Sequence, residues 1–381
     1  MKLRTLLLCT TILFFSTFIT GKTCIAAYPD VYYGGFAYTG KYIDTDNHFK
    51  FTKMLNDSNV SNDTPLEVDI RNLFKDNLNT ISGFHLIFDK AQLSNSNSET
   101  LVMALAVTRE DIYTEELSDC MKVVLNLSLR VVFIEMASKT VVNSYPINLE
   151  LVDVTHHPLD ATYKFNLVKT AYLGSNNSVI SVLSILKQDM ASYKVASSNI
   201  RNFQVRKVTI EDKASQVLFS DNRSSLSDSY ADLIAQKFSD ELSRIAKVSV
   251  LPAGKDSLNG KCSLVFADGK EQDFNIPEAS YAIDINLQDL QTKNLDANDI
   301  EKAIAFGAFL NIRIYEPEYN TEFFQKRIIQ GSAKKFSNTT KGYDAREIFR
   351  EVIQQAVKKA IVEMTNDRKL NREVIAKCVV S

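Results

Sequence analysis

The chain has 381 residues, 45% of them apolar, and a formal net charge of −2, so it is large enough and apolar enough for two ordinary domains. This charge balance lacks the concentrated basic surface of nucleic-acid-binding proteins, so no nucleic-acid partner is expected. With only 12 glycines, the chain is also poor in the glycine-rich turns that cradle phosphates or hold strained nucleophiles.

The first 27 residues have the composition of an export signal. Two basic residues within the first four positions precede a largely apolar stretch, Leu6–Ile19, and small residues stand just before Tyr28. The stretch is shorter than the roughly 20 residues that a spanning helix needs, and no later segment is apolar enough to span a membrane. We therefore expect residues 1–27 to be a signal peptide, with a periplasmic mature protein or, second, an extracellular one.

The cysteines fit an exported chain. Cys24 lies at the end of the leader, but Lys22 disfavours its lipidation, so we expect a soluble mature protein, with a lipid-anchored one as the alternative. The remaining cysteines, Cys120, Cys262 and Cys378, match no metal motif. Cys262 and Cys378 fall in the same half, where an oxidising compartment would allow a disulfide; three free buried thiols are the alternative.

Residues 28–195 are expected to form a first α+β domain. An opening strand is expected at Tyr33–Gly40, and Thr64-Pro65-Leu66-Glu67 has the pattern of a capped helix start. The later elements are expected to be a short strand at His85–Phe88, a buried strand at Leu101–Val107, a long hairpin of Leu125–Phe133 and Val141–Val154, and helices at Ala161–Leu173 and Val179–Met190.

Residues 196–381 repeat much of this order. The expected elements are an extended segment at Phe203–Phe219, a helix opening at Ser225–Asp228, a short strand at Val248–Leu251, a hairpin around Asp268-Gly269, a strand from Tyr281, and a long hairpin of Ala308–Tyr315 and Phe323–Gly331. A closing helix follows the capping pair Asp344 and Glu347. The repeated order predicts an internal duplication: two tandem, similar α+β domains, each a mixed or antiparallel sheet with a long hairpin and amphipathic helices packed on it.

Three stretches of the second half carry a family resemblance: Tyr230–Ala235 with the chain to Val250, Ala279–Ile283, and Leu310–Tyr315 with its returning strand and terminal helix. Their order resembles a bacterial envelope fold shared by the curli secretion lipoprotein, the outer-membrane activators of penicillin-binding proteins and the N-terminal domain of the Tol translocation protein. The chain departs from this group because it has no convincing lipidation site and no long pore-forming insertion. The resemblance implies non-enzymatic work in the envelope: holding, activating or bridging other proteins.

Catalytic motifs are incomplete in this sequence. Ser184–Lys187 and Ser220–Asn222 match two short motifs of penicillin-recognising enzymes, but the Lys-Thr-Gly motif that should follow is missing. His156 and His157 stand before Pro158, where solvated histidines are common. No catalytic residue, metal ligand or cofactor is therefore assigned, and no enzymatic activity is expected.

The sequence favours an exported envelope protein that binds or scaffolds other proteins through sheet edges, hairpin tips or the groove between its halves. A secreted factor acting on a host or neighbouring cell, or a hydrolase with an interdomain site, are the alternatives, and oligomerisation stays open. Six aromatic residues are candidate contacts, each with burial in a core as its alternative: Tyr319, Phe323 and Phe324 on the second hairpin, and Tyr32, Tyr33 and Tyr38 near the mature start.

Overall fold

The computed structural model describes residues 28–40, 48–57, 64–81, 83–89, 100–116, 120–156, 159–174, 180–193, 195, 201–219, 223–252, 261–297, 301–337 and 345–379. The predicted leader, with Cys24, lies outside these residues, and so does the predicted capping residue Asp344.

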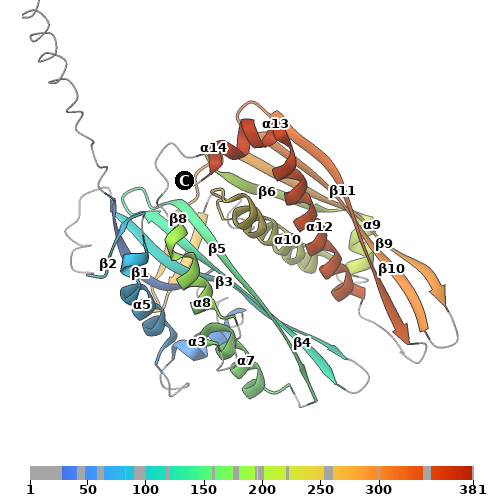
Figure 1. Cartoon of the computed structure of the whole chain (residues 1–381), viewed down its shortest axis with the longest axis horizontal. Coiled ribbons are helices and arrows are strands. Elements are labelled where there is room, and N and C mark those ends of the chain that lie inside the picture. Colours follow the sequence, from blue (N-terminus) through green and yellow to red (C-terminus); the bar gives the residue numbers. More distant parts are fainter. Residues whose placement is uncertain are drawn as a thin grey trace, which may run out of the picture.

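Two β-sheets and the helices beside and between them make up the described fold (Figure 1), which confirms the α+β class. The seven-stranded sheet, in the order β2-β1-β3-β4-β5-β8-β7, consists of β1 (Asp30–Thr39), β2 (His85–Ile87), β3 (Leu101–Glu116), β4 (Met121–Glu135), β5 (Thr140–Thr155), β7 (Lys261–Phe266) and β8 (Glu271–Asn275). The four-stranded sheet, in the order β11-β10-β9-β6, consists of β6 (Phe203–Ile210), β9 (Tyr281–Ala297), β10 (Glu301–Glu316) and β11 (Thr321–Ser337).

The helices form two layers. The main ones are α3 (Lys50–Asn56), α5 (Leu66–Asp76), α7 (Ala161–Leu173), α8 (Val182–Asp189), α9 (Asp212–Phe219), α10 (Arg223–Ala246) and α12 (Ala345–Asn366), and the short α13 (Arg368–Leu370), a π-helical turn (Asn371–Ile375) and α14 (Ala376–Cys378) close the described chain. In Figure 1, α3, α5, α7 and α8 lie on one side of the seven-stranded sheet, and α10 and α12 run between the two sheets. The order of layers is therefore helix, sheet, helix, sheet.

Alternation along the strands explains this layering. On β4, Leu125, Leu127 and Leu129 are buried in a core shared with α5, α7 and α8, while the residues between them face the opposite side. In the second core, Phe238 of α10 and Val352 of α12 pack against the four-stranded sheet. Each helix of the middle layer has a sheet on either side, so its polar face is covered as well as its apolar face. α10 and α12 therefore bury polar as well as apolar side chains.

The β7–β8 hairpin is predicted by the sequence, but it joins the sheet of the first half. β7 pairs antiparallel with β1 from Ala37↔Phe266 to Thr39↔Leu264, and β8 meets β5 at Thr140↔Asn275. These pairings close β1, β3, β4, β5, β8 and β7 into a ring, here called the closed ring. Side chains from all six strands fill it with a small apolar core. The predicted division into domains 28–195 and 196–381, and their duplication, stay predictions.

The prediction of an extended segment over Phe203–Phe219 is wrong in its second part. β6 ends at Ile210, and α9 follows with Ala214 and Leu218, one turn apart, buried against the second core. Apolar residues spaced by four favour a helix when a sheet is there to cover them. The short strand predicted at Val248–Leu251 is reduced to two isolated bridges.

The helix start at residues 64–67 is where the sequence places it, but its cap differs. Pro65 precedes the first helical residue and no local side chain caps the helix. Instead Asn56, the last residue of α3, accepts a hydrogen bond from the backbone N–H of Glu67 at 2.8 Å. A side chain from a neighbouring helix thus supplies the oxygen that Thr64 was expected to provide.

Candidate functional site

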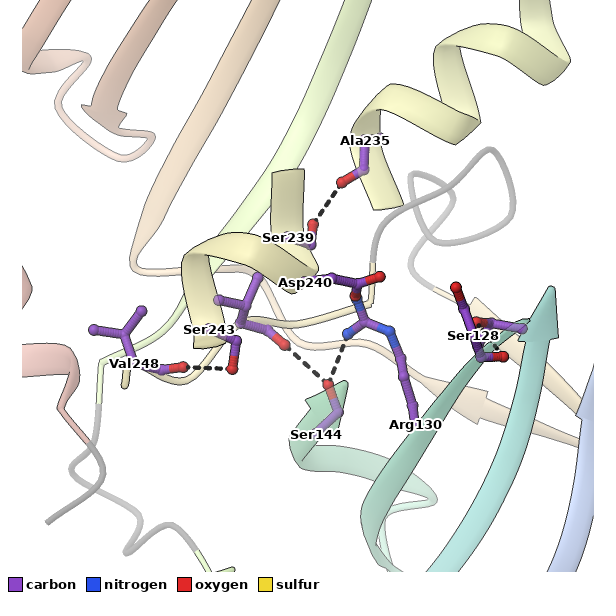
Figure 2. A network of polar contacts seen from close by, with 10 residues as sticks. Ser128, Arg130, Ser144, Ala235, Ser239, Asp240, Ser243 and Val248 are labelled. Carbon is purple, nitrogen blue, oxygen red and sulfur yellow. Dashed lines mark hydrogen bonds and ion pairs between the residues drawn. The ribbon is translucent and has the colours of Figure 1, made fainter. Parts of the chain in front are cut away.

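A buried ion pair joins the seven-stranded sheet to the middle helices. Nη2 of Arg130, on β4, lies 2.7 Å from Oδ1 of Asp240, on α10, and the two side chains are only 5% and 6% exposed. Figure 2 shows Arg130 reaching from its strand toward the helix, with Ser144 of β5 beside it. Arg130 Nη1 donates to the Ser144 hydroxyl at 3.0 Å, and that hydroxyl donates to the carbonyl of Val250 at 2.9 Å. Every donor in this chain of contacts has an acceptor on another element.

The charge of Asp240 depends on this arrangement. Burial raises the pKa of its carboxyl above the usual range, while the positive charge of Arg130 and a hydrogen bond with Asn148 lower it. Removing Arg130 would leave a carboxyl with little access to water and no opposite charge in direct contact. The pair therefore fixes α10 on the sheet and makes this position costly to disturb.

The contacts between the seven-stranded sheet and the middle helices, which begin with Arg130 and Asp240, are here called the junction. Two further contacts extend it. Ser249 donates its hydroxyl hydrogen to Asn143 Oδ1 at 2.9 Å, inside the fold. On α12, the guanidinium of Arg350 lies 3.7 Å from the centre of the Tyr113 ring of β3 and pairs with Glu347 at 3.0 Å. Burial raises the pKa of the Tyr113 hydroxyl to about 12. The long β3–β4–β5 sheet is thus held against both middle helices.

The outer edge of β5 is the part of this sheet that another chain can reach. The inner edge of β5 pairs with β4 from Thr140 to Thr155, but among the described residues its outer edge meets β8 only at Thr140. Val152 and Val154 are 53% and 55% exposed and lie on the same face of the strand. A long strand edge with exposed apolar side chains is a template for pairing with another chain.

Pro146 indicates which backbone groups face that edge. It lies opposite Arg130 within the β4–β5 ladder, and a proline inside a paired strand is tolerated where the N–H position points away from the neighbouring strand. Val152 and Val154 lie an even number of residues from Pro146, and no register shift separates them from it. The backbone N–H groups of both valines therefore point to the outer edge as well. The Val154 N–H donates to Asp153 Oδ1 at 2.8 Å, which covers part of the edge.

The predicted contact aromatics divide into exposed and buried residues. Tyr319, in the turn between β10 and β11, is 69% exposed and remains a candidate contact. The other five lie in or beside the cores: Tyr33, Tyr38 and Phe324 are buried, and Tyr32 and Phe323 are half-buried. The three buried rings stabilise the cores and are not accessible to a partner, because their strands turn them toward the helices.

The predicted disulfide pair is not joined. Cys262 and Cys378 are both free, Cys262 in the core of the closed ring and Cys378 in the core of the four-stranded sheet. β7 takes Cys262 into the first sheet, which sequence distance alone does not reveal. Burial raises the pKa of the Cys378 thiol to about 12, so this group is an unreactive thiol.

The described part of the chain has neither a cluster of metal ligands nor a membrane-spanning helix. No three His, Cys, Asp or Glu side chains there gather as metal ligands do. His156 is exposed, and His157 lies outside the described residues. None of the described helices is long and apolar enough to cross a bilayer.

Sequence reasoning missed the junction although part of its signal was visible. Asn126, Ser128 and Arg130 alternate with leucines on β4, which predicts a polar face turned to solvent. The structure covers this face with α10 and α12, so the polar residues become contacts between layers. Asp240, on a helix 110 residues later, offers no local sign that it pairs with Arg130.

Comparisons with known proteins give only distant likenesses. No protein-family model matches the chain, and no curated protein matches it. Among solved structures, a protein described as a neuraminyllactose-binding hemagglutinin homolog from Helicobacter pylori aligns over 48% of this chain and 97% of its own, with 15% identity and a TM-score of 0.29. The hypothetical protein CT253 from Chlamydia trachomatis aligns over 42% and 96%, with 10% identity and a TM-score of 0.25.

A minor lipoprotein from Acinetobacter baumannii aligns over 45% of this chain and 93% of its own, with 9% identity and a TM-score of 0.19. All three are bacterial proteins, and the last is described as a lipoprotein. Likeness at this level assigns neither a family nor an activity. The resemblance to the curli, penicillin-binding-protein activator and Tol proteins stays a prediction.

Proposed function

We propose that this chain is an exported, non-enzymatic periplasmic protein of the bacterial envelope that binds another protein along the outer edge of β5. The observation that carries the proposal is the open edge itself, with Val152 and Val154 exposed beside backbone N–H groups that point outward. An extended segment of a partner could add to β5 as a further strand, gaining main-chain hydrogen bonds and covering the two valines.

The junction supports this use of the edge. Binding by strand addition is strongest when the receiving strand is already held straight and in place, because no ordering entropy is then lost from it. β5 contributes Ser144 to the Arg130 network, and Arg350 of α12 stacks on Tyr113 of β3, the strand next to β4. The same polar network offers no grouping of nucleophile, base and substrate cavity, which is why a binding role is preferred here to hydrolysis.

A proline scan of the edge tests the proposal. Val152→Pro removes an outward N–H and should leave the ladder with β4 intact, so partner capture by tagged full-length protein in cells should fall at least about tenfold. Val152→Thr, which keeps both the N–H and the β-branched shape, is the matched control and should capture the partner normally. Circular dichroism melts of both variants should match the parent. If Val152→Pro recovers the same partner in the same yield, strand addition at this edge is wrong.

A further inference from the structure

A cavity of ≈ 410 Å³ opens at the mouth of the closed ring. Strands β1, β3, β7 and β8 contribute to its wall, together with Met136 after β4 and Glu67 at the start of α5. Mouths of small β-barrels are common places for ligands, and this volume falls in the range of small-molecule sites.

The cavity exists because the edge of β1 is interrupted. On that edge β1 pairs with β2 over Asp30–Tyr32 and with β7 over Ala37–Thr39, and no described strand pairs with residues 33–36 between them. The strand bulges here, at Gly34 and Gly35, and Gly35 has a φ of +110°. A Cβ on Gly34 would lie 2.6 Å from Val102 Cγ1, so this close approach needs a glycine. The pair of glycines thus lets the cavity reach from the ring toward α5.

One end of the cavity is polar. Tyr33 lines it, is 3% exposed, and has a hydroxyl with no hydrogen-bond partner among the described residues. A carboxylate oxygen of Glu67 lies 3.1 Å from where a Cβ on Gly35 would stand, and the buried Nε of Arg71 also has no partner. Burial and the charge of Glu67 raise the pKa of Tyr33, so its hydroxyl stays protonated and can both donate and accept. Buried polar groups in folded proteins are nearly always paired, so this end is suited to a hydrogen-bonding group.

The rest of the cavity is apolar and its charges balance. Phe36, Val102, Met136, Phe266 and Phe274 supply most of its wall. At the rim, Lys270 and Asp268 pair with each other at 2.9 Å. At the polar end, Glu67 lines the cavity and Arg71, which is not one of the lining residues, carries the opposite charge; both act electrostatically on Tyr33. A ligand with a net charge would meet one favourable and one unfavourable partner at the rim, and an anion would also meet the Glu67 carboxylate at the polar end.

We propose that this cavity binds a small uncharged amphiphile, with an apolar body between the aromatic side chains and one hydroxyl or amide group hydrogen-bonded by Tyr33 and Glu67. This site is separate from the edge of β5 and does not depend on partner binding there.

The test uses fluorescence of N-phenyl-1-naphthylamine, an uncharged apolar probe, with the purified full-length protein. Saturable binding in the micromolar range is expected. The uncharged 4-pentylphenol should displace the probe at a concentration about tenfold lower than the charged 4-pentylbenzoate or 4-pentylbenzylamine, because the loss of one polar contact weakens binding about tenfold. Equal displacement by the three compounds would overturn the assignment of an uncharged ligand. Absence of saturable binding would overturn the site.

Variants that fill the mouth of the cavity with a large side chain provide a second test, with a matched control. Ala267→Trp and Gln272→Trp place an indole at exposed lining positions and should each weaken probe binding at least about tenfold. Ala333→Trp, at an exposed position on β11, is the control and should bind as the parent does. Thermal melts check that all three are folded. If both lining variants bind the probe normally while folded, or if a captured protein partner displaces it competitively, the cavity is not a small-molecule site.

Discussion

Arg130 and Asp240 carry opposite charges into a contact that water hardly reaches. A pair of this kind adds little net stability compared with apolar residues of the same shape, but it becomes expensive when one partner is missing. The consequence is specificity: α10 can dock on β4 in the register that brings the two side chains together, and other registers leave both charges unpaired.

Arg130→Ala should lower the free energy of unfolding by about 3–5 kcal/mol, measured by urea denaturation at pH 7. Because burial already holds the Asp240 pKa above its usual value, the unpaired carboxyl should be protonated more readily. A group with a raised folded-state pKa contributes stability at low pH and loses it as pH rises. The deficit of Arg130→Ala should therefore shrink as the pH falls from about 8 to about 5, and the double variant Arg130→Ala, Asp240→Asn should show no such dependence. A deficit that stays constant with pH would contradict this reading.

Glu110, on β3, caps the N-terminus of α3, although the two elements are distant in the sequence. Its carboxylate accepts the backbone N–H groups of Phe51 at 2.9 Å and Thr52 at 2.7 Å, at the start of α3. Glu110→Ala leaves these donors without an acceptor and should destabilise the protein by about 1–3 kcal/mol in chemical denaturation. Asp111→Ala, at the more exposed neighbouring carboxylate, is the control and should cost less than about 1 kcal/mol. Equal losses would show that the cap contributes nothing special.

At the scale of elements, local sequence patterns predict that the hairpins exist but are less accurate about where their strands begin and end. Strict alternation makes β4 and β5 visible, and the turn at Lys139 lies between the two strands predicted at Leu125–Phe133 and Val141–Val154. β10 begins at Glu301 rather than Ala308, because Ala303, Ala305 and Gly307 are small and give no alternating signal. The seven-residue α3 is missed because it is anchored by Glu110 and Tyr172 rather than by its own periodicity.

The bulge in β1 yields a prediction at this scale. Gly34→Ala would force a Cβ to 2.6 Å from Val102 Cγ1 and should destabilise the protein by about 1–3 kcal/mol. Val102→Ala removes the clashing methyl group, so the double variant should lose less than the sum of the two single losses, by about 1 kcal/mol or more. Strict additivity in a double-mutant cycle would mean that the close approach is relieved elsewhere.

At the scale of the whole molecule, the two halves share structure. The closed ring takes β7 and β8 from residues beyond 196, and the seven-stranded sheet buries Arg130 against α10. Sequence patterns identify each half separately, but pairing between distant strands and ion pairs between layers depend on tertiary contacts that periodicity does not encode. The sequence suggested recognition through sheet edges, hairpin tips or the groove between the halves, which stays a prediction, and it did not indicate that the outer edge of β5 is open.

This sharing predicts how fragments behave. Residues 28–195 alone lack the strands that complete the ring and leave Arg130 unpaired, so they should show weaker amide protection and a lower melting point than the same residues within the full chain. Adding residues 196–381 in trans should restore protection along β1 and β5. A first half that is as stable alone as in the full chain would mean that the ring and junction contribute little.

The measurement that most directly tests the binding role is photo-crosslinking in living cells, with a benzophenone amino acid at Val152 of the full-length protein and, as control, at the 46%-exposed Val362 of α12. Strand addition at β5 predicts a discrete adduct from position 152, recovered in the periplasmic fraction, that position 362 does not give. The absence of an adduct at position 152, or identical adducts at both positions, would contradict the account.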